Sequence, residues 1–61
     1  MSDLDTYARA GIEAVNEKKF DVAIENFEKA LALDPDRPDL NNALGMAYLN
    51  RGEVGSAVPH L

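Results

Sequence analysis

Three aspartates clustered around two prolines form the densest group of potential metal ligands in the sequence. They are Asp34, Asp36 and Asp39. A calcium loop that began at Asp34 would need a glycine at its sixth position and a glutamate at its twelfth. Those positions hold Asp39 and Gly45. We therefore interpret the cluster as a solvated turn between two helices, in which carboxylates cap helix ends, and predict no metal site.

Two pairs of carboxylates have the spacing that brings side chains together on a helix. Glu13 is followed four residues later by Glu17, and Asp21 by Glu25. Paired carboxylates support acid–base catalysis only when their surroundings separate the two pKa values. Lysines lie close to both pairs in the sequence, which favours a solvated, charged helix face. We therefore assign these pairs no catalytic role.

Nucleophilic catalysis finds equally little support. The chain has no cysteine, and its single histidine, His60, follows Ser56 by four residues. A catalytic triad needs a third group that orients the base, and the sequence suggests none nearby. Gly52 and Gly55 are spaced as in a turn, without the Lys-Ser/Thr that ends a phosphate-binding loop. The sequence therefore predicts a protein that is not an enzyme and uses no cofactor.

Composition narrows the choice of partners. The chain has 61 residues, of which 46% are apolar, enough for one small domain. Six Lys and Arg against 11 Asp and Glu give a net charge of -5, which argues against nucleic acids and anionic membranes as partners. No apolar run approaches the roughly 18 residues of a membrane span, and the first residues do not resemble a signal peptide. We expect a cytoplasmic protein.

Apolar residues recur at spacings of three and four, which predicts helices throughout. We expect the first helix over about 3–17 and the second over about 21–33. The third should run over about 37–50, with Pro38 in its first turn, where proline is well tolerated. A fourth should begin at about 54. Because no segment alternates like a strand, the predicted fold is all-α, with antiparallel helix pairs.

The residues between these helices suggest where each begins and ends. Ser2 and Asp3 are good N-cap types for the first helix, Asp21 can cap the second, and Asp36 can cap the third. Pro35 should end the second helix, because the residue before a proline is displaced from helical backbone angles.

An internal repeat appears when the chain is compared with itself at an offset of 34. Gly11 then aligns with Gly45, and Ala23 aligns with Ala57. A glycine at a helix crossing needs no space for a side chain, and a small alanine lets the second helix approach the first. The offset therefore predicts two copies of a helix–turn–helix unit.

This pattern resembles the tetratricopeptide repeat (TPR) family, whose helix–turn–helix unit has about 34 residues. The first unit matches the family pattern at Tyr7, Gly11, Ala23, Phe27, Ala30 and Pro35, and the second at Leu44, Gly45, Tyr48, Ala57 and Leu61. It departs from the pattern at Ala10, Ala14 and Asn41, where the family prefers larger or aromatic residues. The resemblance implies one unit over 1–61, an α-solenoid fragment with one repeat over about 4–37 and a partial repeat over about 38–61.

In TPR arrays the first helix of each repeat lines a concave groove. The resemblance implies groove positions at Asp5, Ala8, Ile12, Val15 and Asn16 in the first repeat, and at Asp39, Asn42, Met46, Leu49 and Asn50 in the second. Periodicity independently places Ala8, Ile12 and Val15 on one helix stripe. The implied function is a scaffold that binds a partner helix or extended peptide. The alternative is that neighbouring repeats cover these residues.

One TPR subclass grips the C-terminal carboxylate of its partner with a lysine and two asparagines. The corresponding positions here hold Ala8, Ile12 and Ala43. We therefore do not expect this chain to recognise a terminal carboxylate in that way.

Self-association is the alternative function. The second repeat is incomplete, so apolar residues at its edge would contact water unless another copy covered them. The residues expected at this edge are Tyr48, Val54, Val58 and Leu61. The sequence leaves open a peptide-binding scaffold and a homo-oligomer, and the size of the protein in solution would separate them.

Overall fold

Three helices of equal length make up most of the residues that the computed structural model describes, which are residues 2–52. They are α1 (Asp3–Asn16), α2 (Phe20–Leu33) and α3 (Pro38–Arg51). No strand occurs within 2–52, so the all-α prediction is confirmed, and the first three helices begin within a residue of their predicted positions. The fourth predicted helix, from about 54, lies outside the described residues.

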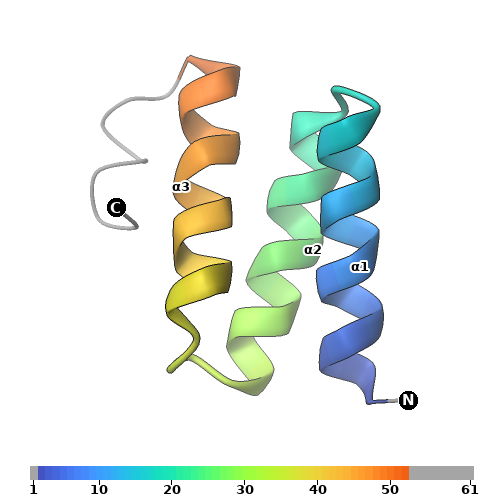
Figure 1. Cartoon of the computed structure of the whole chain (residues 1–61), viewed down its shortest axis with the longest axis vertical. Helices are drawn as coiled ribbons and strands as arrows, with labels where there is room; N and C mark the ends of the chain where they lie inside the picture. The colour runs from blue at the N-terminus through green and yellow to red at the C-terminus, as the bar shows by residue number, and fades with distance from the viewer. Residues whose placement is uncertain (1, 53–61) are drawn as a thin grey trace.

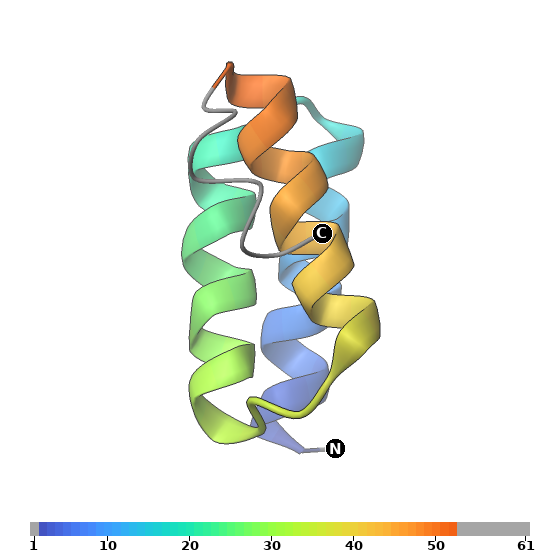
Figure 2. The ribbon, with the colours of Figure 1, turned by 90° about the vertical axis from the view of Figure 1, so that its left-hand side faces the viewer.

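The helices alternate in direction, and α2 lies between the other two (Figure 1). α1 packs on α2, and α2 packs on α3. Figure 2 shows α1 and α3 on the same side of α2, where both run in the same direction. The two helices that begin the predicted repeats therefore share one face of the molecule, as the TPR resemblance implies.

The beginning of α1 is capped as the sequence predicts. Ser2 has an extended backbone, and its hydroxyl accepts a hydrogen bond of 3.2 Å from the backbone N–H of Asp5. The Thr6 hydroxyl donates to the Ser2 carbonyl at 3.2 Å. Asp3, the other candidate cap, lies in the first turn, where a carboxylate suits the positive end of the helix dipole.

The turn between α1 and α2 contains a left-handed residue that is not glycine. Lys18 has a φ of 61°. Its N–H donates to the carbonyl of Val15 at 2.9 Å, and the N–H of Lys19 donates to that of Ala14 at 2.8 Å. This pair of bonds is a Schellman motif, which satisfies the last carbonyl groups of α1 and reverses the chain.

The prediction that Asp21 caps α2 is wrong. The helix begins at Phe20 and its N-cap is Lys19, whose side chain makes no capping bond. The Schellman turn ends at Lys19, so helical geometry starts there and places Asp21 inside the first turn. Its carboxylate instead forms an ion pair of 2.7 Å with Arg51 at the end of α3.

The connection between α2 and α3 follows from its two prolines. Asp34, which precedes Pro35, is extended with a φ of -149° and ends α2 as predicted. Its side chain accepts a bond of 3.2 Å from the N–H of Asp36. Asp36 is therefore held in the turn, and the prediction that it caps α3 is wrong. The N-cap is Arg37, and Pro38 occupies the first helical turn as predicted.

The core is built around α2. The buried apolar residues are Ala14 from α1, Ala23, Ile24, Phe27 and Ala30 from α2, and Leu40, Leu44 and Ala47 from α3. Gly11 lies against Phe27, and a Cβ atom at Gly11 would come within 2.5 Å of the Phe27 ring. The predicted role of Gly11 at a helix crossing is therefore confirmed.

Candidate functional site

A hollow of about 210 Å³ separates α1 from α3. Its lining residues are Ile12, Val15 and Asn16 from α1, Phe27 from α2, and Ala43, Met46, Ala47 and Asn50 from α3. We call it the α1–α3 groove. Its walls belong to the two predicted repeats, and α2 contributes the Phe27 side chain, which is 1% exposed.

Five of the ten groove positions implied by the TPR resemblance line this hollow. They are Ile12, Val15, Asn16, Met46 and Asn50. The sequence interpretation missed Phe27, Ala43 and Ala47. Ala43 and Ala47 stand one turn apart, with Ala43 three residues before Met46, so helical spacing alone was a signal for them.

The other five predicted positions do not line the hollow. Asp5 and Ala8 lie on the same stripe of α1 as Ile12, nearer the beginning of the helix, and Asp39 precedes Met46 by two turns on α3. These three continue the two walls toward the helix N-termini. Asn42 and Leu49 lie on the neighbouring stripe of α3, and both are exposed to solvent.

The lining of the groove is apolar with amides at one end. Ile12 is 53% exposed and Met46 is 49% exposed, although both are large apolar residues. The Asn50 amide donates to the Met46 carbonyl at 2.9 Å, which holds it against α3. No lining residue is charged. The hollow can therefore accept apolar side chains, and it offers no group for acid–base chemistry.

Charges gather beyond the groove, at the N-terminal end of its α3 wall. Arg37 donates to both carboxylate oxygens of Asp39, from Nε at 3.3 Å and from Nη2 at 3.2 Å. This hydrogen bonding lowers the pKa of Asp39 and raises the pKa of Arg37. The charges of Asp34 and Asp5 also raise the pKa of Arg37, so carboxylates from α1 and from the α2–α3 connection act on the same guanidinium.

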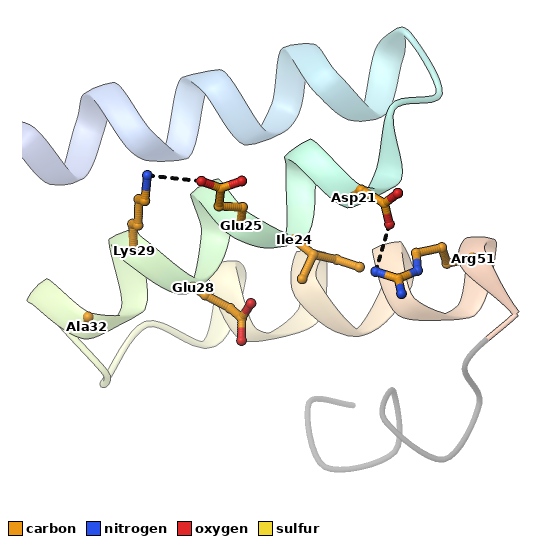
Figure 3. A pocket seen from close by; sticks show the side chains of 7 residues that line it. All are labelled: Asp21, Ile24, Glu25, Glu28, Lys29, Ala32 and Arg51. Carbon is orange, nitrogen blue, oxygen red and sulfur yellow. Dashed lines mark ion pairs between the residues drawn. The ribbon is translucent and has the colours of Figure 1, made fainter.

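A second hollow, of about 570 Å³, lies between α2 and α3. Figure 3 shows its lining residues, Asp21, Ile24, Glu25, Glu28, Lys29, Ala32 and Arg51. Glu25 pairs with Lys29 at 3.2 Å, and Asp21 pairs with Arg51 at 2.7 Å (Figure 3). Both members of the Asp21–Glu25 carboxylate pair are thus engaged with cations on a charged surface.

The remaining candidates for chemistry add no site. Within residues 2–52, no group of three or more His, Cys, Asp or Glu side chains is placed to hold a metal ion. The Ser56–His60 pair lies outside the described residues. Of the predicted self-association edge, Tyr48 is half-buried against the core. The rest of that edge, Val54, Val58 and Leu61, lies outside the described residues.

Among residues 2–52, no helix is both long enough and apolar enough to cross a membrane.

Comparison with known families identifies the architecture. A family model described as a TPR repeat matches residues 15–52, which is more than half of the chain and includes all of α2 and α3. Searches of curated proteins and of solved structures found no match. TPR repeats generally mediate protein–protein interaction, bind proteins or peptides, and are typically not enzymes. The repeat offset, the antiparallel helices and the family match agree: this chain belongs to the tetratricopeptide repeat family.

Proposed function

We propose that this chain is a scaffold module that binds a helix or an extended segment of a partner protein in the α1–α3 groove. The observation that carries the proposal is the half-exposed state of Ile12 and Met46 on facing walls of an apolar hollow. Single exposed apolar residues are ordinary on protein surfaces, but a hollow lined by several of them is typical of binding sites. A methionine adapts its shape to different side chains, which suits a peptide-binding surface.

The lining also bears on how a partner is recognised. A terminal carboxylate binds most strongly to a cation, and the groove lining has no charged residue; its amide side chains are those of Asn16 and Asn50, and the Asn50 amide already donates to the Met46 carbonyl. Ala8, Ile12 and Ala43 stand where the carboxylate-binding TPR subclass has its lysine and asparagines. The proposed partner segment is therefore held by its apolar side chains rather than by its chain end.

Substitutions in the groove test this proposal. A panel of synthetic peptides with apolar centres is titrated into the protein while the methyl resonances of Ile12 and Met46 are followed by NMR. Binding should shift these resonances, and Ile12→Ser with Met46→Ser should weaken it more than about tenfold, since each lost apolar contact is worth about 1–2 kcal/mol.

Val22→Ser with Leu33→Ser is the matched control. These residues are 44% and 55% exposed, and both lie on α2 outside the groove. The control should bind like the parent. Peptides that bind equally well to the groove variant, or that shift resonances only at other places, would refute the proposal.

Self-association is the second candidate. The observation that favours it is the open hollow beside α3, whose volume of about 570 Å³ exceeds that of the groove. Five of its seven lining residues are charged, however, which suits water better than an apolar edge from another copy. We therefore rank it below the peptide-binding scaffold.

A further inference from the structure

The two walls of the α1–α3 groove carry the same sequence of chemical groups in the same direction. On α1, Asp5 is followed by Ile12 and then by Asn16. On α3, the residues at the offset of 34 are Asp39, Met46 and Asn50. α1 and α3 run parallel on one side of α2 (Figures 1 and 2). Both walls therefore pass from a carboxylate, through an apolar residue, to an amide.

The carboxylate end of the groove is strongly negative. Asp5 and Asp39 are joined there by Asp3 in the first turn of α1, and by Asp34 and Asp36 in the α2–α3 connection. Arg37 lies at this end, and Arg9 follows Asp5 by one turn on α1. The carboxylates of Asp5, Asp34 and Asp39 all raise the pKa of Arg37. The beginnings of α1 and α3 and the α2–α3 connection lie at the same end of the molecule (Figure 1), so these carboxylates act on one region.

The helix dipoles do not cancel this charge. The N-termini of α1 and α3 contribute roughly half a positive charge each, or about one in total. Five carboxylates and the guanidiniums of Arg37 and Arg9 leave a formal charge of about three negative units at the same end. At the other end Lys18, Lys19 and Arg51 accompany Glu17 and Asp21, a formal charge of about one positive unit that the C-termini of α1 and α3 offset. The field along the groove therefore changes from negative to nearly neutral.

On the basis of the function proposed above, we infer that the groove binds an apolar peptide segment flanked at one end by lysine or arginine. The basic flank lies beside Asp5 and Asp39, and the apolar side chains lie against Ile12 and Met46. A segment with an acidic flank is repelled from the same place. Charge complementarity of this kind selects partners and sets the direction of binding more than it adds affinity.

Three peptide libraries test the inference. They share one randomised apolar centre and differ only in a flank of two lysines, two glutamines or two glutamates, all with capped ends. At low salt the lysine library should bind about three- to tenfold tighter than the glutamine library, because exposed charge pairs are individually weak. The glutamate library should bind more weakly than both. The differences should shrink as the Debye length falls from about 30 Å at 0.01 M salt to about 3 Å at 1 M.

Two pairs of charge-removing substitutions separate a local effect from net charge. Asp5→Asn with Asp39→Asn should abolish the preference for lysine over glutamine flanks while leaving glutamine-flanked peptides bound. Glu25→Gln with Glu28→Gln removes the same charge from the α2–α3 hollow and should retain the preference. Circular dichroism confirms that each variant is folded before its binding is measured.

The placement of the flank is tested by cross-linking. A photo-reactive group beside the two lysines should label the first turns of α1 or α3, and not the region of Asn16 and Asn50. Labelling at the amide end, equal binding by all three libraries, or a preference that survives the Asp5→Asn, Asp39→Asn variant would overturn the inference while leaving the proposed function intact. Failure of every library to bind the groove would overturn the proposed function, and the inference with it.

Discussion

At the scale of single residues, Phe27 belongs both to the buried core and to the lining of the groove. Its ring is almost completely buried, lies against Gly11 on α1, and forms part of the groove lining. The absence of a side chain at Gly11 is therefore what lets the ring sit at this depth. A substitution at Gly11 should therefore change both the stability of the protein and the shape of the groove.

Gly11→Ala should destabilise the protein. The added Cβ would come within 2.5 Å of the Phe27 ring, so the ring or the helix must move. Overpacking of this kind costs about 1–3 kcal/mol, which exceeds the roughly 0.5–1 kcal/mol that alanine gains over glycine within a helix. Thermal unfolding followed by circular dichroism measures the difference.

The matching control combines Gly11→Ala with Phe27→Leu. The smaller and more flexible leucine should relieve the overlap, so the alanine should cost less in that background than in the parent. Equal costs in both backgrounds would show that the ring is not the obstacle.

Lys18→Gly should stabilise the protein. Lys18 has a φ of 61°, a conformation that costs an ordinary residue about 1–2 kcal/mol and glycine almost nothing. Glycine loses more entropy on folding, which leaves a net gain of about 1 kcal/mol. Urea denaturation measures this change in the free energy of unfolding. Lys19→Gly, at a φ of -96°, is the control and should bring no gain; a gain of equal size there would contradict the explanation.

Acid should weaken the contribution of Asp39 to stability. Its pKa is lowered in the folded protein by the hydrogen bonds from Arg37. Since the folded pKa lies below the unfolded value of about 3.9, the contribution is present above that value and is lost as the pH falls through the folded pKa. An NMR titration of the Asp39 carboxyl should show a midpoint that rises in Arg37→Gln. An unchanged midpoint would mean that Arg37 is not the cause.

At the scale of helices, the sequence predicted the elements well and their caps less well. Apolar spacing located all three described helices, and Pro35 and Pro38 marked an end and a beginning because proline restricts its own backbone and that of its neighbour. Asp21 and Asp36 were predicted as caps from residue type alone. Which residue becomes the cap depends on where the preceding turn ends, and the left-handed Lys18 moved that point.

The ion pair between Asp21 and Arg51 joins the beginning of α2 to the end of α3, but it should contribute little to stability. Its side chains are 81% and 40% exposed, and exposed pairs are typically worth about 0.2–1 kcal/mol. A double-mutant cycle with Asp21→Asn and Arg51→Gln should give a coupling energy within that range at low salt. The coupling should weaken at 1 M salt, where the Debye length of about 3 Å is close to the separation of the pair; a large coupling that salt does not change would show that the pair is effectively buried.

At the scale of the whole molecule, the family resemblance predicted which helices face each other across the groove, but not the depth of the hollow. Val15, Asn16 and Met46 were recoverable from repeat positions. The place of Phe27 in the lining was not, because it depends on how far α1 and α3 stand apart, a distance set by packing on α2 rather than by any local pattern.

The chain should remain monomeric at moderate concentration if the scaffold proposal is right. Outside the groove, the large exposed apolar residues within 2–52 are Val22 and Leu33 on α2 and Leu49 on α3, and the broader hollow is charged. Light scattering over a concentration series measures the oligomeric state. If a dimer forms and the substitutions Val58→Asp with Leu61→Asp dissolve it, the self-association candidate is supported instead.

The walls of the groove come from α1 and α3, which stand at the same position in successive repeats. A single helix pair would present one wall and no groove. Tandem duplication of such a unit therefore creates a groove at the junction without any new side chain, because the second copy brings the same Asp, apolar and Asn pattern into register with the first. Each copy can afterwards change in sequence independently, so that the residues of one groove wall can be replaced while the other wall keeps its pattern.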